Sequence, residues 1–255
     1  MAPFAILVFV LLILGIVLCE RNKESESIRM RNAVFLAVSG VILTLFAALR
    51  AKSVGIDYQM YEQYFNAMRE GGAGFLFSGE NQYRVEWGYS LLNYLVSLVS
   101  GDIRVFMAVA ALLIMGLTCL FIAKNSPSWW LSIFAFVSFG FYTNSLCFIR
   151  QSIATAIFLF AIPFLKQKKL LPYLGIVVLA ASFHKALFVM VVLYFIAHIP
   201  VNWKSLTAYG VLTALVLIFS WPIFHFVTQF VYQYYATEDG LYYMQSPDSQ
   251  TASLP

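Results

Sequence analysis

The sequence predicts an all-α, polytopic bundle of transmembrane helices. Hydrophobic residues make up 61% of the 255 residues, charged residues make up only 11%, and the mean hydropathy is +0.80. A water-soluble domain of this length could not bury so much apolar surface. The apolar runs are long and continuous, whereas the strands of a membrane β-barrel alternate apolar and polar residues. These observations exclude both of those classes.

About eight apolar runs are expected to span the membrane. Several are shorter than the roughly 20 residues that a straight span needs, which predicts tilted helices or local thinning of the bilayer. The first run has neither a basic leader nor a small-residue cleavage site, so we expect it to be retained as a helix. The runs are 2–19, 32–49, 105–123, 128–144, 150–165, 170–183, 186–199 and 205–221.

The basic loops 20–31 and 166–169 decide the expected topology. The positive-inside rule places both in the cytoplasm, which requires an even number of spans between them. That condition holds only if the weaker run 87–100 does not cross, so we expect a re-entrant or interfacial helix there, on the outer side. Nine basic residues then lie inside and seven outside.

In this topology one integral membrane domain covers residues 1–255, with an outer-face loop over 50–104 and a polar tail over 236–255. A site would face outward, because the unusual polar residues gather on that side. The net charge of +4 suits membrane loops and gives no indication of nucleic-acid binding. The outer polar residues are Arg50, Asp57, Glu86, Arg150, Gln151, His184 and Lys185.

Arg150 is the only charged residue between Ser128 and Leu165. An arginine near hydrocarbon is costly, so it is usually kept for a partner or a ligand. Its planar fork suits phosphate oxygens. The alternative is an arginine that snorkels to the headgroups, but no belt of other charges flanks it. A ligand or ion-pair role is favoured, with Gln151 beside it.

The tyrosines after Asp57 follow helical spacing and continue into Phe65 and Met68, which predicts an amphipathic helix with an aromatic stripe. Two interpretations stay open. Asp57 could cap this helix while Tyr58 and Tyr61 anchor it at the interface. Alternatively, Asp57 is a base or a hydroxyl-binding carboxylate, and the two tyrosines are stacking platforms for sugars.

Two further polar positions have the same double interpretation. Glu86 either caps the short helix that follows it or forms an acid pair with Asp57. His184 and Lys185 interrupt an apolar run, which predicts the tip of a helical hairpin. A histidine there is either a satisfied polar group or one that shuttles a proton or binds phosphate. Three scattered histidines without metal-ligand spacing predict no metal, and no cofactor is expected.

In their order along the chain, these pieces resemble the EpsG family of bacterial exopolysaccharide proteins, related in role to the Wzy polymerases. The ordered set carries the resemblance more than any single piece, and it extends from residue 50 to about residue 199. The pieces are Arg50, Gly55-x-Asp57-Tyr58-x-x-Tyr61, Glu86-x-Gly88-Tyr89, Arg150-Gln151-x-Ile153-Ala154 and Ala180-Ala181-x-Phe183-His184-Lys185.

The resemblance implies a multi-pass protein of the bacterial cytoplasmic (inner) membrane, similar to membrane glycosyltransferases of the C type. It implies an enzyme that polymerises polyprenyl-diphosphate-linked oligosaccharide repeats at the outer face for exopolysaccharide, capsule or O-antigen. Beyond this substrate and the lipid bilayer, a flippase and a chain-length regulator are implied partners. Family members are usually longer, so a truncated or frameshifted C-terminus is expected after Tyr243.

On this hypothesis fixed cations stabilise the leaving lipid diphosphate, Arg150 first and then Arg50 or Lys185. Candidates for handling the proton of the attacking hydroxyl are Asp57, Glu86 and His184. The alternatives are a ligase or an acyltransferase on the same substrates, a flippase or transporter, and an inactive fragment retained for assembly. A transporter would need a polar path to both faces, whereas these polar residues gather at one face and no inverted repeat is visible.

Overall fold

The computed structural model describes residues 2–19, 26–52, 54–55, 57–77 and 85–235, and within these ranges the regular structure is entirely helical. The predicted all-α class is confirmed. The chain divides into two compact units, Met1–Ala197 and His198–Pro255. The single domain expected over 1–255 stays a prediction, and the expected polar tail 236–255 lies outside the described residues.

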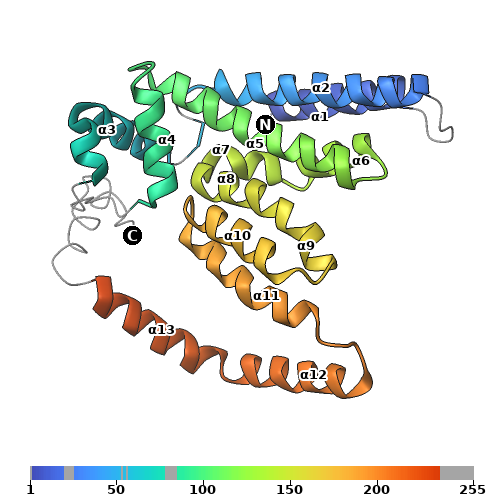
Figure 1. Cartoon of the computed structure of the whole chain (residues 1–255), viewed down its shortest axis with the longest axis vertical. Coiled ribbons are helices and arrows are strands. Elements are labelled where there is room, and N and C mark those ends of the chain that lie inside the picture. Colours follow the sequence, from blue (N-terminus) through green and yellow to red (C-terminus); the bar gives the residue numbers. More distant parts are fainter. Residues whose placement is uncertain (1, 20–25, 53, 56, 78–84, 236–255) are drawn as a thin grey trace, which may run out of the picture. The chain divides into compact units, whose positions relative to one another are not determined.

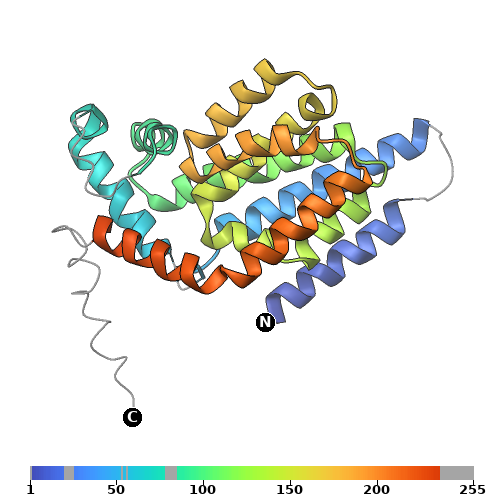
Figure 2. The same cartoon turned by 90° about the horizontal axis from the view of Figure 1, so that it is seen from below.

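The first unit holds the long helices and the short elements between them (Figure 1). Its elements, in chain order, are α1 (Ala2–Leu18), α2 (Glu26–Ala48), α3 (Tyr58–Phe77), α4 (Trp87–Ser97), α5 (Ile103–Asn125), α6 (Trp129–Ser138), α7 (Phe141–Cys147), α8 (Ile149–Phe158), the 3-10 turn η1 (Leu159–Ala161), α9 (Ile162–Lys166), α10 (Leu170–Ala181), the 3-10 turn η2 (Lys185–Val189) and α11 (Met190–Ala197). Helices α1 and α2 run alongside each other, and α2 also packs along α5 (Figures 1 and 2).

Every predicted apolar run is helical, but not every helix is long enough to cross a bilayer by itself. Three segments pass on length and composition: Arg29–Ala48, Ile103–Asn125 and Ile149–Lys166. Two bent pairs raise the number to five if each is one span: Trp129–Ser138 with Phe141–Cys147, and Trp203–Ile218 with Ser220–Gln229. The described residues thus support a multi-pass protein with three to five spans by length and composition, and three more of the expected runs form shorter apolar helices, Phe4–Leu18, Leu170–Ala181 and Lys185–Ala197.

The bend between α6 and α7 measures 55° and has a local cause. Gly140 adopts φ 82°, in the left-handed region that glycine enters without steric cost. Its carbonyl accepts a hydrogen bond from the Thr143 hydroxyl at 2.8 Å. The run 128–144 therefore forms a broken element, where we expected one continuous helix.

Helix α3 and the short helix α4 pack against each other and against α5, in part through aromatic side chains. The predicted amphipathic helix is confirmed as α3, whose buried face includes Phe65 and Met68. Tyr89 of α4 meets Phe106 of α5 edge to face, with ring centroids 5.6 Å apart. Such a pair contributes about 0.5–1.5 kcal/mol beyond its buried area. At 11 residues α4 is not among the candidate spans, and its expected place at the outer face stays a prediction.

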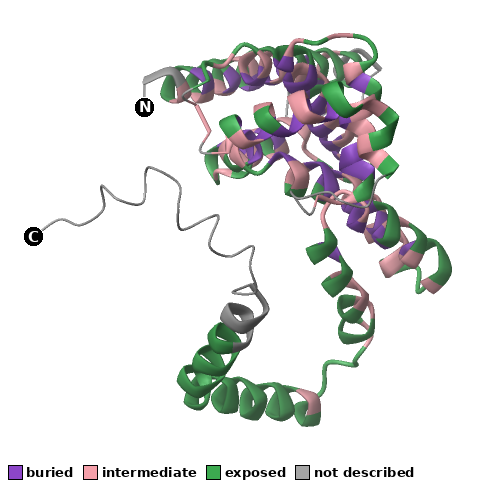
Figure 3. Ribbon diagram, turned by 90° about the vertical axis from the view of Figure 1, so that its left-hand side faces the viewer, coloured by how far each residue is buried: buried purple, intermediate pink, exposed green. Residues whose placement is uncertain are grey.

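The second unit consists of α12 (Trp203–Ile218) and α13 (Ser220–Tyr235), which bend by 62° at their junction. A capping box starts α12: the Asn202 side chain accepts from the Ser205 backbone, and the Ser205 hydroxyl accepts from the Asn202 N–H. Figure 3 shows large exposed areas along α12, whereas buried residues gather in the first unit. Wide apolar exposure is typical of surfaces that face lipid.

Candidate functional site

The break between α7 and α8 places Arg150. Phe148 adopts φ −99° and ψ 63°, which ends α7 at Cys147 and restarts the chain as α8 at Ile149. Arg150 is therefore the second residue of a helix. A cation there opposes the helix dipole, which favours negative charge at an N-terminus. An anionic neighbour would offset this unfavourable placement.

Glu86 supplies that anion and joins three segments. Its Oε2 lies 2.9 Å from Arg150 Nη1, and its Oε1 accepts a hydrogen bond of 3.1 Å from the Lys185 backbone N–H. Glu86 occupies the position before α4, but its side chain makes no capping bond to that helix. Glu86 is thus the N-cap residue of α4 by position, while its carboxylate connects α4, α8 and the start of η2.

His184 lies beside the same carboxylate. Its Nδ1 is 3.5 Å from Glu86 Oε1, and this nitrogen is buried without a hydrogen-bond partner among the described residues. The side chains of Glu86, Arg150 and His184 are 9%, 25% and 27% exposed. His184 follows α10 in the chain turn before η2, so the predicted hairpin tip is confirmed. The Lys185 side chain is exposed, and only its backbone takes part in this cluster.

A close backbone contact holds this cluster together. The Gly88 N–H donates a 2.7 Å hydrogen bond to the Ser182 carbonyl, just after α10. A Cβ at position 88 would come within 2.5 Å of the Ser182 hydroxyl and 2.9 Å of its carbonyl oxygen. Only glycine permits this approach, which brings Glu86 within reach of the residues that follow Ser182.

The side chain of Tyr61 hydrogen-bonds the backbone groups at the break between α7 and α8. Its hydroxyl donates to the Cys147 carbonyl and accepts from the Ile149 N–H, each at 3.1 Å. Both groups lie at the helix break, where a buried backbone group without a partner would be costly. Tyr61 thereby fixes the residue that precedes Arg150.

The expectation that Tyr58 and Tyr61 are open stacking platforms is contradicted by their burial. Each side chain is only 3% exposed, so protein covers the ring faces. Both belong to the packed face of α3. An aromatic stripe at helical spacing was correctly interpreted as a helix face, but this face is turned toward the core of the unit.

Asp57 lies near the same break. Gly55, two residues earlier, adopts φ 106°, and a Cβ there would come 2.9 Å from the Leu146 carbonyl oxygen at the end of α7. The Asp57 carboxylate is half-buried and has no hydrogen bond or ion pair among the described residues. Burial raises the pKa of Tyr61 to about 12, and the charge of Asp57 adds to this shift.

Arg50 lies two residues beyond α2. Its Nη2 donates to the Met107 sulfur at 3.4 Å, and its Cζ lies 5.8 Å from the centroid of the Tyr58 ring. Its Nε is buried without an acceptor among the described residues. Burial lowers the pKa of the Arg50 guanidinium from its ordinary value, although arginine keeps its charge.

The structure therefore brings part of the predicted set together. Glu86, Arg150 and His184 are in contact, Tyr61 anchors the residue before Arg150, and Arg50 lies against the Tyr58 ring. The side chains of Gln151 and Lys185 lie outside this cluster, since both are exposed and the Gln151 side chain makes no hydrogen bond to another described residue. Within the described ranges, no group of three His, Cys, Asp or Glu side chains could hold a metal ion.

Sequence reasoning missed the residues that position the others. Tyr89 was quoted only as part of a motif, yet its ring lies 6.0 Å from Arg150 Cζ, in cation–π range. Gly55 and Gly88 mark close approaches that only the folded chain reveals. The sequence signal that could have found them is spacing, because Gly55 lies two residues before Asp57 and Gly88 lies two residues after Glu86.

The fold and these features define a multi-pass helical membrane protein with a polar cluster beside a helix break. The chain belongs to the EpsG family, whose model matches residues 33–249, most of its length. This membership connects the chain with exopolysaccharide biosynthesis. No curated protein and no solved structure matches the chain.

Proposed function

We propose that this chain polymerises polyprenyl-diphosphate-linked oligosaccharide repeats at the outer face of the bacterial cytoplasmic membrane. Membership of the EpsG family and the apolar helices support a membrane enzyme of polysaccharide synthesis. The polar cluster supports a site for an anionic, lipid-linked substrate. The donor is already activated as a diphosphate, so the reaction needs no nucleotide at the site.

One observation carries the proposal, which is how Arg150 is held. Glu86 binds only Nη1, and the other guanidinium nitrogens have no acceptor among the described residues. The side chain is 25% exposed. Arg150 is thus oriented by the protein yet keeps donors for a second anion. A guanidinium binds phosphate oxygens with two parallel hydrogen bonds, which a lysine cannot do.

The proposed step joins two lipid-linked glycans. The acceptor hydroxyl oxygen bonds to the anomeric carbon of the donor chain, while the bond from that carbon to the diphosphate oxygen breaks. The leaving diphosphate takes the electron pair of the broken bond, and Arg150 stabilises its developing charge. An oxocarbenium-like transition state is expected, as in other glycosyl transfer.

Asp57 is the proposed proton acceptor for the attacking hydroxyl, with His184 second. Asp57 fits this role because its carboxylate is half-buried and unpaired among the described residues. Glu86, expected to be an acid or base, already binds Arg150 and the Lys185 N–H. We therefore assign it to positioning Arg150. Arg50 and Lys185 remain secondary candidates for contact with the diphosphate.

The test is the size profile of surface polysaccharide in a strain that lacks the gene, with wild type or Arg150→Ala returned. The proposal expects single lipid-linked repeats in the deletion strain and long chains only with wild type. Long polymer without the gene, or full restoration by Arg150→Ala, would contradict it. Full-length polymer that accumulates on its lipid in the deletion strain would instead identify a ligase.

A further inference from the structure

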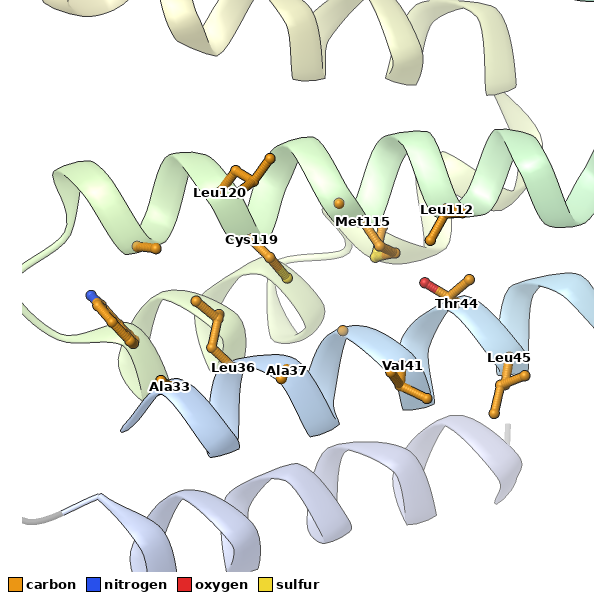
Figure 4. Close-up of a pocket in the computed structure, with 14 residues that line it drawn as sticks. Ala33, Leu36, Ala37, Val41, Thr44, Leu45, Leu112, Met115, Cys119 and Leu120 are labelled. Carbon is orange, nitrogen blue, oxygen red and sulfur yellow. The ribbon is translucent and has the colours of Figure 1, made fainter. Parts of the chain in front are cut away.

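An apolar hollow lies along the packing of α2 and α5, and none of the polar-cluster residues lines it. It has a volume of about 530 Å³, within the range of about 300–1,000 Å³ that is typical of ligand sites. No lining residue is charged, and Thr44 carries the only hydroxyl. Figure 4 shows the side chains of both helices around this groove.

Small residues create the room. Ala37 and Gly40 line the groove from α2, and Gly116 and Ala123 line it from α5. The space beside Gly116 is open, since a Cβ there would meet no atom within 4 Å. The rim carries exposed apolar side chains, including Leu112 at 62% exposure. An apolar chain could therefore enter sideways from the bilayer.

The groove extends from Ala33 to Leu45 along α2, which corresponds to about 18 Å at 1.5 Å per residue. Arg50 lies five residues beyond Leu45. Met115 lines both this groove and a small neighbouring cavity that Arg50 also lines. A long apolar slot thus ends close to a guanidinium whose Nε is buried without an acceptor among the described residues. This arrangement is complementary to an apolar chain with a negative group at one end.

We propose that the α2–α5 groove binds the isoprenoid tail of the lipid-linked substrate, with its diphosphate directed toward Arg50. This site rests on the proposed function for the identity of its ligand. A phospholipid also has an apolar chain and a phosphate. The proposed reaction, however, consumes a polyprenyl-diphosphate-linked glycan and releases polyprenyl diphosphate, so we assign the groove to this lipid. The site therefore retains the carrier lipid during the reaction.

The test uses the purified full chain in lipid nanodiscs and a polyprenyl diphosphate with a photoreactive diazirine in its tail. Labelled peptides are located by mass spectrometry. The variant is Gly116→Leu, which fills the groove from a helix where leucine is a better helix former than glycine. Gly175→Leu in α10 is the matched control, because its Cβ also meets nothing within 4 Å and it lies outside the groove.

The expected result is labelling of α2 and α5 that falls about tenfold or more in Gly116→Leu and not in Gly175→Leu, since several apolar groups lose their burial. Equal labelling of all three proteins would overturn the proposal. So would displacement of the probe by ordinary phospholipid, or cross-linking of α2 to a second copy of the chain.

The labelling experiment measures binding and needs no turnover, so it separates the two proposals. If the groove labels as expected but long polymer forms without the gene, the proposed function fails and the lipid site stands. If polymer needs the gene but Gly116→Leu labels like wild type, the groove assignment alone fails.

Discussion

Arg150 and Arg50 carry the same guanidinium into two different surroundings. Arg150 is paired with Glu86 at 2.9 Å and is 25% exposed. Arg50 has a methionine sulfur and a tyrosine ring as neighbours, and its Nε is buried without an acceptor among the described residues. The protein therefore gives Arg150 an anionic partner, whereas Arg50 has no anionic partner among the described residues. An anionic ligand would bind Arg150 alongside Glu86, but at Arg50 it would supply an acceptor where the described residues supply none.

The largest effect is expected at the paired arginine. Arg150→Ala should reduce long polymer by about 10²–10³-fold, the usual loss when one donor to developing negative charge is removed. Arg150→Lys should recover only part of this, because lysine keeps the charge but loses the fork. The readout is polymer yield and length in a complemented deletion strain.

Arg104→Ala is the control for that experiment. Arg104 also pairs with a carboxylate, at 2.7 Å from Asp102, but its side chain is 76% exposed. Its removal should leave stability and polymer length nearly unchanged, because an exposed ion pair contributes little to stability. A similar loss of polymer in both variants would indicate general destabilisation of the protein and no specific role for Arg150.

Replacement of Arg50 should not lower the stability of the protein. Arg50→Met keeps an apolar side chain of similar reach and removes the buried Nε. Because an unsatisfied buried donor costs about 1–3 kcal/mol, the variant should be as stable as wild type or more so. Polymer yield should nevertheless fall about tenfold if Arg50 contacts the substrate phosphate. Thermal unfolding in detergent and the polymer profile, measured on the same variant, decide between a structural and a ligand role.

Tyr61 is expected to couple stability to the site. Tyr61→Phe removes both hydrogen bonds at the α7–α8 break and should destabilise the protein by about 1–3 kcal/mol. Polymer should fall severalfold, because the residue before Arg150 loses its anchor. Tyr173→Phe loses one hydrogen bond, from its hydroxyl to the Met190 carbonyl, and should lower stability without shortening the polymer. Unchanged polymer in Tyr61→Phe would remove its positioning role.

The same hydroxyl also predicts a pH dependence of stability that leaves polymer synthesis at neutral pH unaffected. The pKa of Tyr61 is raised to about 12, so the folded state holds this proton more tightly than the unfolded state. Its contribution is complete below about pH 10 and is lost as pH rises toward 12, up to about 3 kcal/mol. Unfolding midpoints of wild type should therefore drop more steeply than those of Tyr61→Phe over that interval. Parallel profiles would contradict the burial of this hydroxyl.

Composition and periodicity were enough to predict the helical membrane class and the amphipathic α3. They did not predict the break in the run 128–144, where Gly140 takes a left-handed conformation. The apolar content of a run shows that it can lie in lipid, but it does not show where the backbone bends. That information lies in single residues and their neighbours in space.

The site was predicted as a set of residue types but not as a set of contacts. Glu86 lies 64 residues from Arg150 in the sequence, and Tyr61 lies 88 residues from Ile149, so no local spacing could pair them. A rare charge in an apolar run correctly drew attention to Arg150. Burial of Tyr58 and Tyr61 could not be predicted, since an interfacial stripe and a core-facing stripe have the same period.

The central claim is that Arg150 serves the substrate and does more than neutralise Glu86. A double-mutant cycle on Glu86→Gln and Arg150→Ala tests it most directly, with unfolding in detergent and polymer length measured for all four proteins. The account predicts that the double variant regains stability over Arg150→Ala alone, because no buried carboxylate is left unpaired, yet still makes no long polymer. Recovery of long polymer together with stability would show that the arginine is only a structural partner.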